Sequence, residues 1–282
     1  MEKITKEKVE TFIPQRKKES YKGTYGRVLF VGGNENMGGA IMLSASAGVH
    51  SGAGLVTVAT HPSNQAALHS QLPEAMFLPF TDLDQLRKTV DTMDVILIGP
   101  GLGRDEQAVS VLKTVYETVE NDQTLILDGD AIYLHVNEIL PKPVASIIFT
   151  PHLGEWRTLT GLPVDEQYLE TNHSKAVDMD AVIVLKKSRT EVYYGEEVWQ
   201  NTAGNPAMAT GGMGDTLAGM IAGFVAQFDD DKEAVLSAVY MHSYIADELA
   251  KNQYVTLPSH IIREIPKTMK DFTKKAGKLR FI

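Results

Sequence analysis

The sequence predicts an α/β fold, namely a three-layer α/β/α domain with a mostly parallel central sheet plus a hairpin. Short apolar runs typical of buried strands alternate with helical patterns along most of the chain. This alternation favours parallel strands joined by crossover helices. Several apolar runs end in glycine or polar residues, as is typical where strands exit toward a ligand. No linker divides the 282 residues, so we expect a single domain over residues 1–282.

The first element expected is a short amphipathic helix within residues 1–26. Its apolar residues recur at helical spacing and precede a basic polar link, RKKESYKGTYG. A basic run of this kind is usually a solvated surface segment. The apolar residues of this expected helix are Ile4, Val9, Phe12 and Ile13.

A β-strand, helix and second strand are expected next, at residues 27–33, 38–52 and 55–60. The turn after the first strand, G-G-N-E-N-M-G-G-A, holds more glycine than packing alone requires. It lacks the G-x-x-x-x-G-K-[ST] pattern of a P-loop, and it lacks G-x-G-x-x-G with an acid about 20 residues later. A Rossmann dinucleotide site is therefore disfavoured.

Four more apolar strands are expected further along the chain, followed by a hairpin around Gly195 that makes the sheet mixed. Asp128 and Asp130 follow one strand and either pair at a metal or form a turn, and spacing favours the turn. His242 lies in a long amphipathic helix, where a core position is favoured over catalysis. The strands are expected at residues 94–103, 124–130, 146–152 and 180–188, and the helices at 105–120, 215–228, 232–251 and 258–272.

Composition excludes several classes of function. The formal net charge of -9 argues against a nucleic-acid partner, because duplex binding requires a basic face. The absence of cysteine excludes disulfides, thiol catalysis and thiolate metal sites. The charged N-terminus does not resemble a signal peptide, and no apolar run reaches the roughly 18 residues of a membrane span. We therefore expect a cytoplasmic protein that does not bind membranes.

The glycine-dense turn at residues 211–214, called the glycine turn below, is the strongest functional signal. Gly211, Gly212 and Gly214 surround Met213, and Asp215 then opens a well-patterned helix. Free backbone N–H groups and the positive end of a helix dipole suit a phosphate or a developing oxyanion. A carboxylate in this place can accept a proton from an attacking hydroxyl. The alternative is that Asp215 merely caps the helix or interacts with its dipole.

The stretch N-T-A-G-N-P-A-M-A-T-G-G-M-G-D-T-L-A-G resembles the signature of the ADP/ATP-dependent NAD(P)H-hydrate dehydratases, a branch of the ribokinase-like superfamily. The resemblance implies a ribokinase-like fold and repair of hydrated NADH or NADPH, called NADHX and NADPHX. ADP or ATP would phosphorylate the C6 hydroxyl of the S epimer, and phosphate would then be eliminated, with Mg²⁺ bridging the nucleotide oxygens. The enzyme is then a lyase. We also expect a homo-oligomer, with a tetramer favoured.

The same resemblance implies two sets of binding residues. The substrate set is Ala40, Gly103, His152 and Asp215, and Asp215 is also the catalytic base. The nucleotide set is Lys187, Ser188, Arg189, Thr190, Glu191, Gly212 and Gly214. Neither the resemblance nor the sequence identifies the metal ligands. Two positions depart from the family pattern: Tyr21 stands where His is common, and Ser188 follows Lys187 where the family usually has Lys-Gly.

Two other functions also require consideration. A ribokinase-like kinase for hydroxymethylpyrimidine, hydroxyethylthiazole or pyridoxal needs the same Gly-Asp turn. It is disfavoured because N-T-A-G-N-P and S-G-A-G-L-V-T-V occur together, a combination that resembles the dehydratases. A non-catalytic nucleotide sensor is the second alternative. Loss of the acid would indicate it, and Asp215 is present.

Overall fold

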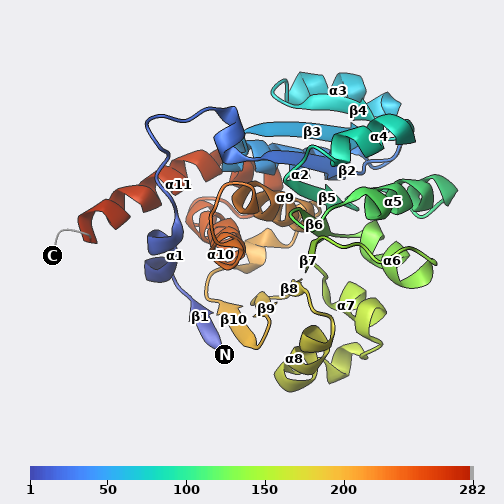
Figure 1. The fold of residues 1–282 in the computed structure, drawn as a ribbon. Coiled ribbons are helices and arrows are strands. Elements are labelled where there is room, and N and C mark those ends of the chain that lie inside the picture. Colours follow the sequence, from blue (N-terminus) through green and yellow to red (C-terminus); the bar gives the residue numbers. More distant parts are fainter. Residues whose placement is uncertain (280–282) are drawn as a thin grey trace.

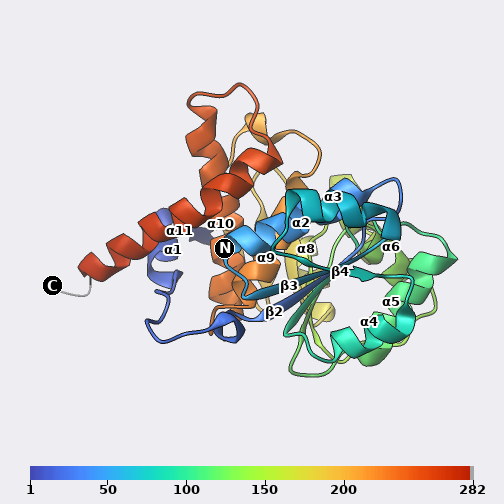
Figure 2. The same ribbon diagram turned by 90° about the horizontal axis from the view of Figure 1, so that it is seen from above.

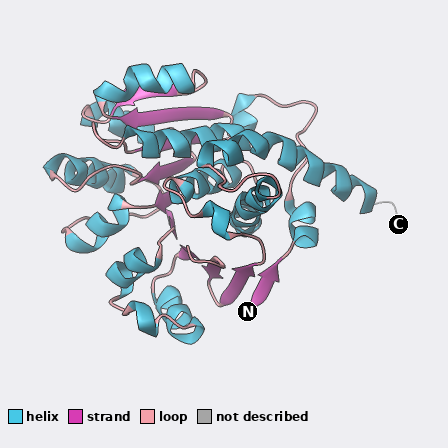
Figure 3. Ribbon diagram, turned by 180° about the vertical axis from the view of Figure 1, so that it is seen from behind, coloured by secondary structure: helices cyan, strands magenta, loops and turns pink. Residues whose placement is uncertain are grey.

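A computed structural model describes residues 1–279, and the side chains of residues 1–273. Within this part of the chain, ten strands form one sheet that lies between helices (Figure 1 and Figure 3). Their order across the sheet is β1 (Glu2–Ile4), β10 (Glu197–Asn201), β9 (Glu191–Tyr194), β8 (Val182–Leu185), β7 (Ser146–Phe149), β6 (Thr124–Leu127), β5 (Val95–Ile98), β2 (Arg27–Val31), β3 (Leu55–Thr60) and β4 (Met76–Pro79).

The sheet is mostly parallel, and β9 alone among these strands runs antiparallel to both of its neighbours, β8 and β10. The predicted hairpin is therefore confirmed. Central strands are buried on both faces: Val28 and Phe30 of β2 join one apolar core, and Leu29 and Val31 join the other. Burial on both faces explains why these strands read as continuous apolar runs in the sequence.

Helices cover the two faces of the sheet and complete the predicted three layers (Figure 2). None of the helices described within residues 1–279 is long and apolar enough to cross a membrane. One core contains residues of α1 (Lys6–Phe12), α2 (Gly38–Ser51), α3 (Gln65–Gln71), α9 (Met213–Val225), α10 (Asp231–Ala250) and α11 (Pro258–Leu279). The other contains residues of α4 (Leu83–Val90), α5 (Glu106–Thr118), α6 (Asp130–Asn137), α7 (Leu153–Thr160) and α8 (Leu169–Asp178).

Two helices on the first face, α2 and α9, pack with their backbones in close contact. A Cβ atom built on Gly219 of α9 would lie 2.1 Å from the carbonyl oxygen of Ser44 in α2. One turn further, a Cβ on Gly223 would lie 2.9 Å from the carbonyl oxygen of Gly48. The Ser44 hydroxyl also donates a 2.9 Å hydrogen bond to the backbone oxygen of Asp215. These contacts fix the amino end of α9 relative to the sheet.

The prediction for the first residues was wrong at Ile4. This residue lies in the edge strand β1 and pairs with Asn201 of β10, while α1 begins only at Lys6. The exposed edge of β10 offers unpaired backbone groups, and pairing satisfies them while the Ile4 side chain becomes fully buried. Residues 61–93, to which the sequence analysis assigned no elements, hold α3, β4 and α4.

Gly219→Ala tests the contact between α2 and α9. The added methyl group overlaps the Ser44 carbonyl, so we expect the free energy of unfolding to fall by about 1–3 kcal/mol, the usual cost of overpacking. Urea denaturation measures this change in the free energy of unfolding. The matched control is Gly39→Ala in α2, where a new Cβ meets no atom within 4 Å, and it should unfold at the wild-type urea concentration or slightly above. Equal stability of Gly219→Ala and wild type would show that the helices can separate without cost.

Candidate functional site

The carboxyl ends of the parallel strands bring charged residues from three turns together. Asp128 follows β6, His152 lies after β7, and Lys186 follows β8. A parallel bridge between His152 and Lys186 continues the pairing of the last two strands. The start of α9 reaches the same edge, since Asp215 interacts electrostatically with Asp128 and Lys186. The exits of these strands therefore converge at one edge of the sheet.

The centre of this edge is a lysine held between two carboxylates. The Nζ atom of Lys186 lies 2.7 Å from Oδ1 of Asp128 and 3.9 Å from Oε2 of Glu155. The same Asp128 oxygen accepts a 2.7 Å hydrogen bond from the Thr150 hydroxyl. Burial opposes the charge on Lys186, but the two carboxylates outweigh it and raise the pKa of its ammonium group. Lys186 is therefore a permanent cation in a mostly buried position.

Asp215 lies beside this cluster in the first turn of α9, as predicted. Burial raises its pKa to about 6. The negative charge of Asp128 acts in the same direction, and the nearby ammonium of Lys186 partly opposes it. The carboxylate thus titrates near neutral pH, in the range suited to accepting a proton.

The glycine turn is shaped by its backbone and by its neighbours. Gly212 caps α9 with a φ of 89°, a left-handed conformation that favours glycine. A Cβ atom on Gly212 would also lie 2.5 Å from Cδ1 of Leu43. At Gly214, a Cβ atom would lie 3.1 Å from Nζ of Lys186. The ammonium therefore lies directly over the turn whose N–H groups suit an anion.

A cavity of about 600 Å³ opens beside the turn, between the exit of β8 and the start of α9, and it is called the hairpin cavity below. Its lining includes Gly214 and the loop from Lys186 to Thr190. Residues of the N-T-A-G-N-P segment, which spans residues 201–206, also line it. The Arg189 side chain reaches across and donates a 2.8 Å hydrogen bond to the backbone oxygen of Thr202. Five residues of the predicted nucleotide set line this cavity: Lys187, Ser188, Arg189, Thr190 and Gly214.

Two residues of the predicted nucleotide set lie behind this lining. Glu191 is 3% exposed. Its carboxylate pairs with Lys187 at 2.6 Å and accepts a 2.7 Å hydrogen bond from the Tyr193 hydroxyl. Gly212 shapes the turn without lining the cavity. Contact between this set and a nucleotide stays a prediction.

Two of the predicted substrate residues, Gly103 and Ala40, lie at or near the turn that follows β5. Gly103 has a φ of 91°, and its N–H donates a 3.0 Å hydrogen bond to Asp130. Ala40 lies near the same turn, because a Cβ atom on Gly101 would lie 3.3 Å from the Cβ atom of Ala40. Their role in substrate binding stays a prediction as well.

His152 has a structural role and an exposed face at once. Its Nδ1 atom accepts hydrogen bonds from the N–H groups of Gly154 and Glu155 and so caps α7. The Glu155 carboxylate returns the bond by accepting from the His152 backbone N–H at 2.8 Å. The His152 side chain is still 60% exposed. Capping fixes the ring while its outer edge stays accessible to a ligand.

Lys186, Asp128 and Glu155 belong to the site but are not among the residues predicted for it from the sequence. Spacing favours a turn over a metal site for Asp128 and Asp130 together, yet the structure separates their contacts. Asp128 is buried against Lys186, whereas Asp130 accepts hydrogen bonds from Gly103 and Arg104. The available signals were an acid directly after a strand, and the glutamate of T-P-H-L-G-E. Neither signal identifies its partner lysine, which lies 58 residues from Asp128.

His242 is buried, as predicted, and it also lines the hairpin cavity. Burial lowers the pKa of its imidazole to about 4, and the charge of Lys186 acts in the same direction. Its Nε2 atom has no hydrogen-bond partner among the described residues. The ring is therefore neutral at physiological pH.

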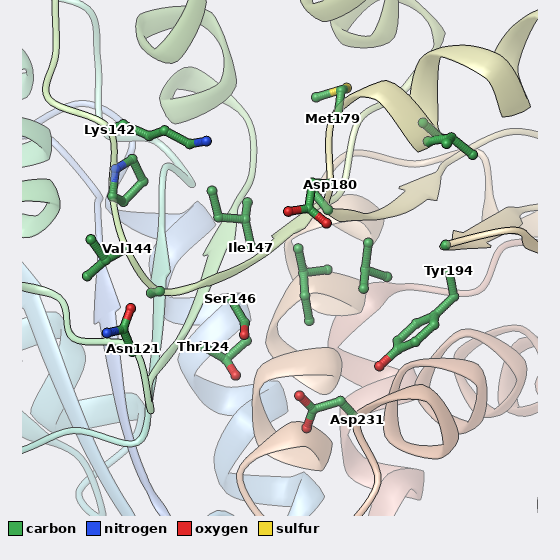
Figure 4. A pocket seen from close by; sticks show the side chains of 18 of the residues that line it. Asn121, Thr124, Lys142, Val144, Ser146, Ile147, Met179, Asp180, Tyr194 and Asp231 are labelled. Atoms are coloured by element: carbon green, nitrogen blue, oxygen red, sulfur yellow. The ribbon is translucent and has the colours of Figure 1, made fainter.

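A second cavity, of about 960 Å³, lies at the opposite ends of the strands (Figure 4). It is lined by Thr124 and Ser146, the first residues of β6 and β7, and by Tyr194 at the end of β9. Asp231, the first residue of α10, also lines this cavity. Ligands of open α/β sheets bind at the carboxyl ends of the strands, so this cavity does not belong to the candidate site.

A magnesium ion fits the site only together with a phosphate ligand. Among the side chains described for residues 1–273, no group of three or more His, Cys, Asp or Glu residues could hold a metal ion. Mg²⁺ usually keeps several waters and binds through one or two carboxylates plus substrate phosphates. The carboxylates nearest the glycine turn, Asp128, Glu155 and Asp215, are compatible with this second arrangement.

Comparisons with known proteins agree on one family. The family model described as NAD(P)H-hydrate dehydratase matches residues 28–267. An ADP-dependent (S)-NAD(P)H-hydrate dehydratase of Staphylococcus aureus is 51% identical over 259 residues, which cover 92% of this chain and 94% of the relative. A ribokinase-like superfamily protein of Enterococcus faecalis superimposes with a TM-score of 0.92 at 45% identity, covering 97% of this chain and 96% of the other.

A second solved structure is also similar to this chain. The ADP/ATP-dependent NAD(P)H-hydrate dehydratase of Bacillus subtilis, co-crystallised with ATP and Mg²⁺, has a TM-score of 0.85 at 34% identity. The match covers 96% of this chain and 98% of that chain. The predicted ribokinase-like fold is thereby confirmed.

Asp215→Asn should stabilise the protein at neutral pH. Because the folded-state pKa of Asp215 is raised from 3.8 to about 6, its ionisation costs stability as the pH rises through this interval. A neutral amide removes the cost, so we expect the free energy of unfolding to rise by about 1–3 kcal/mol at pH 7. The gain should vanish near pH 4. Urea denaturation at both pH values tests this, with the exposed Asp165→Asn as control. A variant less stable than wild type at pH 7 would contradict the prediction.

Proposed function

Because the chain belongs to the NAD(P)H-hydrate dehydratase family, we propose that its strand-exit cluster restores NADH or NADPH from the S epimer of the hydrate. ADP or ATP supplies the phosphoryl group. The observation that carries the proposal is the position of Asp215, whose pKa of about 6 suits a base and which lies beside a turn suited to phosphate.

The chemical problem is a poor leaving group. Hydroxide does not readily leave C6 of the hydrated nicotinamide ring, whereas phosphate does. Asp215 removes the proton of the C6 hydroxyl, and the oxygen attacks the terminal phosphorus of the nucleotide. The bond from this phosphorus to its bridging oxygen breaks at the same time, so AMP leaves when ADP is the donor and ADP leaves when ATP is the donor. The C6–O bond of the phosphorylated hydrate then breaks, phosphate leaves with the bonding electrons, and loss of the C5 proton restores the double bond.

Each side of the cluster has a separate task in this proposal. The backbone N–H groups of Gly212 to Gly214 stabilise negative charge on the transferred phosphoryl group. The loop from Lys187 to Glu191 binds the nucleotide in or beside the hairpin cavity. Ala40, Gly103 and His152 hold the nicotinamide half of the substrate. Asp128, Glu155 and Asp215 lie where they would hold a Mg²⁺ ion that arrives with the nucleotide, and this ion would supply charge neutralisation.

The assembly and compartment expected from the sequence complete the proposal. We propose a cytoplasmic homo-oligomer, with a tetramer favoured, built from a single domain per chain. The absence of a membrane-spanning helix in residues 1–279 is compatible with this compartment. A broad groove is required, because the substrate carries an adenosine diphosphate-ribose besides its nicotinamide.

A direct assay tests the reaction. Purified protein is mixed with the S epimer of hydrated NADPH, Mg²⁺ and either ADP or ATP, and the NADPH absorbance band is followed. We expect the band to return only when nucleotide is present. The same protein should not phosphorylate hydroxymethylpyrimidine, hydroxyethylthiazole or pyridoxal. Efficient phosphorylation of one of these alcohols without recovery of NADPH would favour the vitamin-precursor kinase instead.

Asp215→Asn should lower turnover by about 10² to 10⁴, the usual contribution of a positioned base. Nucleotide affinity should stay the same or improve, because a negative charge near phosphate is removed. In the wild type, kcat/KM should fall as the pH drops below about 6, where Asp215 takes up a proton. Steady-state kinetics from pH 5 to pH 8 measure both effects. Turnover of the variant close to the wild-type value would exclude Asp215 as the base.

A further inference from the structure

The turn after β5 carries an arginine directly after Gly103, one of the residues predicted to bind the substrate. The Nε atom of Arg104 donates a 2.7 Å hydrogen bond to Oδ1 of Asp130, at the start of α6. The other oxygen of Asp130 accepts a 3.0 Å hydrogen bond from the Gly103 N–H. The guanidinium carbon of Arg104 also lies 4.0 Å from the ring centroid of Tyr133. One edge and one face of the guanidinium are therefore held beside the Gly103 turn.

The two Nη groups of this guanidinium are open to a ligand. Arginine has five N–H donors in a planar fork, which matches a phosphate group through two parallel hydrogen bonds. Among residues 1–273, whose side chains the structure describes, none accepts a hydrogen bond from Nη1 or Nη2 of Arg104, because the ion pair with Asp130 uses Nε. The Arg104 side chain is 55% exposed. A simple link between the turn and α6 uses one donor, so four donors stay available.

A second donor borders the same turn. The Oδ1 atom of Asn34 accepts 2.9 Å hydrogen bonds from the backbone N–H groups of Asn36 and Met37, and this fixes the orientation of the amide. Its Nδ2 atom lies 3.1 Å from the position of a Cβ atom built on Gly103. This Nδ2 donates no hydrogen bond to any of the described residues. Arg104 and Asn34 therefore both place free donors at the Gly103 turn, which suits an anionic ligand.

These donors lie on the proposed substrate side of the site. Two strands, β6 and β7, separate β5 from β8, whose exit borders the hairpin cavity. Three strand spacings of about 4.8 Å place the two exits roughly 14 Å apart. The proposed substrate carries a pyrophosphate next to its nicotinamide ribose, whereas the 2′-phosphate of NADPHX lies further away, on the adenosine ribose. With the nicotinamide held at Gly103, the pyrophosphate is the first anionic group within reach of Arg104.

We propose that Arg104 binds the pyrophosphate of the hydrated dinucleotide, with Asn34 as a second donor and with Asp130 and Tyr133 as positioning residues. The inference rests on the proposed function, because the hydrated dinucleotide is the substrate of that reaction. Arg104 then selects dinucleotides over nicotinamide nucleosides. It does not distinguish NADHX from NADPHX, because both carry the same pyrophosphate.

Truncation of Arg104 tests the proposal through the separate effects on KM and kcat. Arg104→Met should raise the KM for NADHX by about 10-fold to 100-fold, the range of a lost charged hydrogen bond. The kcat should stay within about twofold of the wild type, because the pyrophosphate is bound equally before and during the reaction at C6. NADPHX should show the same increase in KM. Steady-state kinetics with saturating ADP measure these constants. An unchanged KM for NADHX, or an increase confined to NADPHX, would overturn the proposal.

A substrate without phosphate separates pyrophosphate binding from a structural role. Hydrated reduced nicotinamide riboside ends at the ribose, so its kcat/KM should be the same within about twofold in Arg104→Met and the wild type. Equal losses for the riboside and the dinucleotide would show that Arg104 only holds the Gly103 turn, and would overturn the proposal. Arg104→Lys keeps the charge but loses the planar fork, so its KM for NADHX should lie between those of the wild type and Arg104→Met. A KM no lower than that of Arg104→Met would contradict an ionic contact with the substrate.

Arg87→Met is the matched control. Arg87 of α4 is 45% exposed and pairs with Glu117 at 3.6 Å, near the end of α5, whereas Arg104 precedes the start of the same helix. Its loss should leave the KM for NADHX unchanged. An equal increase in KM for Arg87→Met would reduce the effect to net charge and overturn the proposal. A wild type that restores no NADPH would refute the proposed function and this inference with it, whereas an active wild type with an unchanged KM in Arg104→Met would refute this inference alone.

Discussion

Parallel pairing of the central strands is the constraint on which the rest of the structure depends. When neighbouring strands run in the same direction, all of their carboxyl ends meet at one edge of the sheet. The turns after β5, β6, β7 and β8 carry Gly103, Asp128, His152 and Lys186, which are far apart in the sequence. The pairing alone brings these turns side by side, before any side chain makes a contact.

The second requirement is a helix whose amino end reaches the same edge. Close packing of α9 on α2 provides it, because Gly219 and Gly223 leave room for the backbone of the neighbouring helix. The hydrogen bond from Ser44 to the backbone of Asp215 joins the two helices at the site itself. A bulkier interface would move the glycine turn away from Lys186. Packing in the core and phosphate geometry at the edge are thus connected through one pair of helices.

The charges at this edge show a balance between stability and chemistry. Burying Asp215 beside Asp128 raises its pKa to about 6, so the folded protein bears a cost to keep it ionised at neutral pH. The same perturbation gives the carboxylate a proton affinity suited to a base. Lys186 limits the cost, since its positive charge acts on Asp128, Glu155 and Asp215 together. One cation and three acids leave an excess of negative charge at this edge, which a bound cation would offset.

Much of this protein was determined by its sequence. Apolar runs and helical spacing predicted the strands from β2 onward except β4, the hairpin and the three layers, and the glycine turn predicted Asp215 in the first turn of α9, because these patterns lie in neighbouring residues. Local patterns failed at Ile4, whose strand exists only because β10 offers an edge. They also could not identify Lys186 as the partner of Asp128. Only the tertiary structure decided that pairing. The attraction depends on a 2.7 Å distance between two residues that are 58 positions apart in the sequence. Pairing of the strands sets this distance, and no local sequence pattern predicts it.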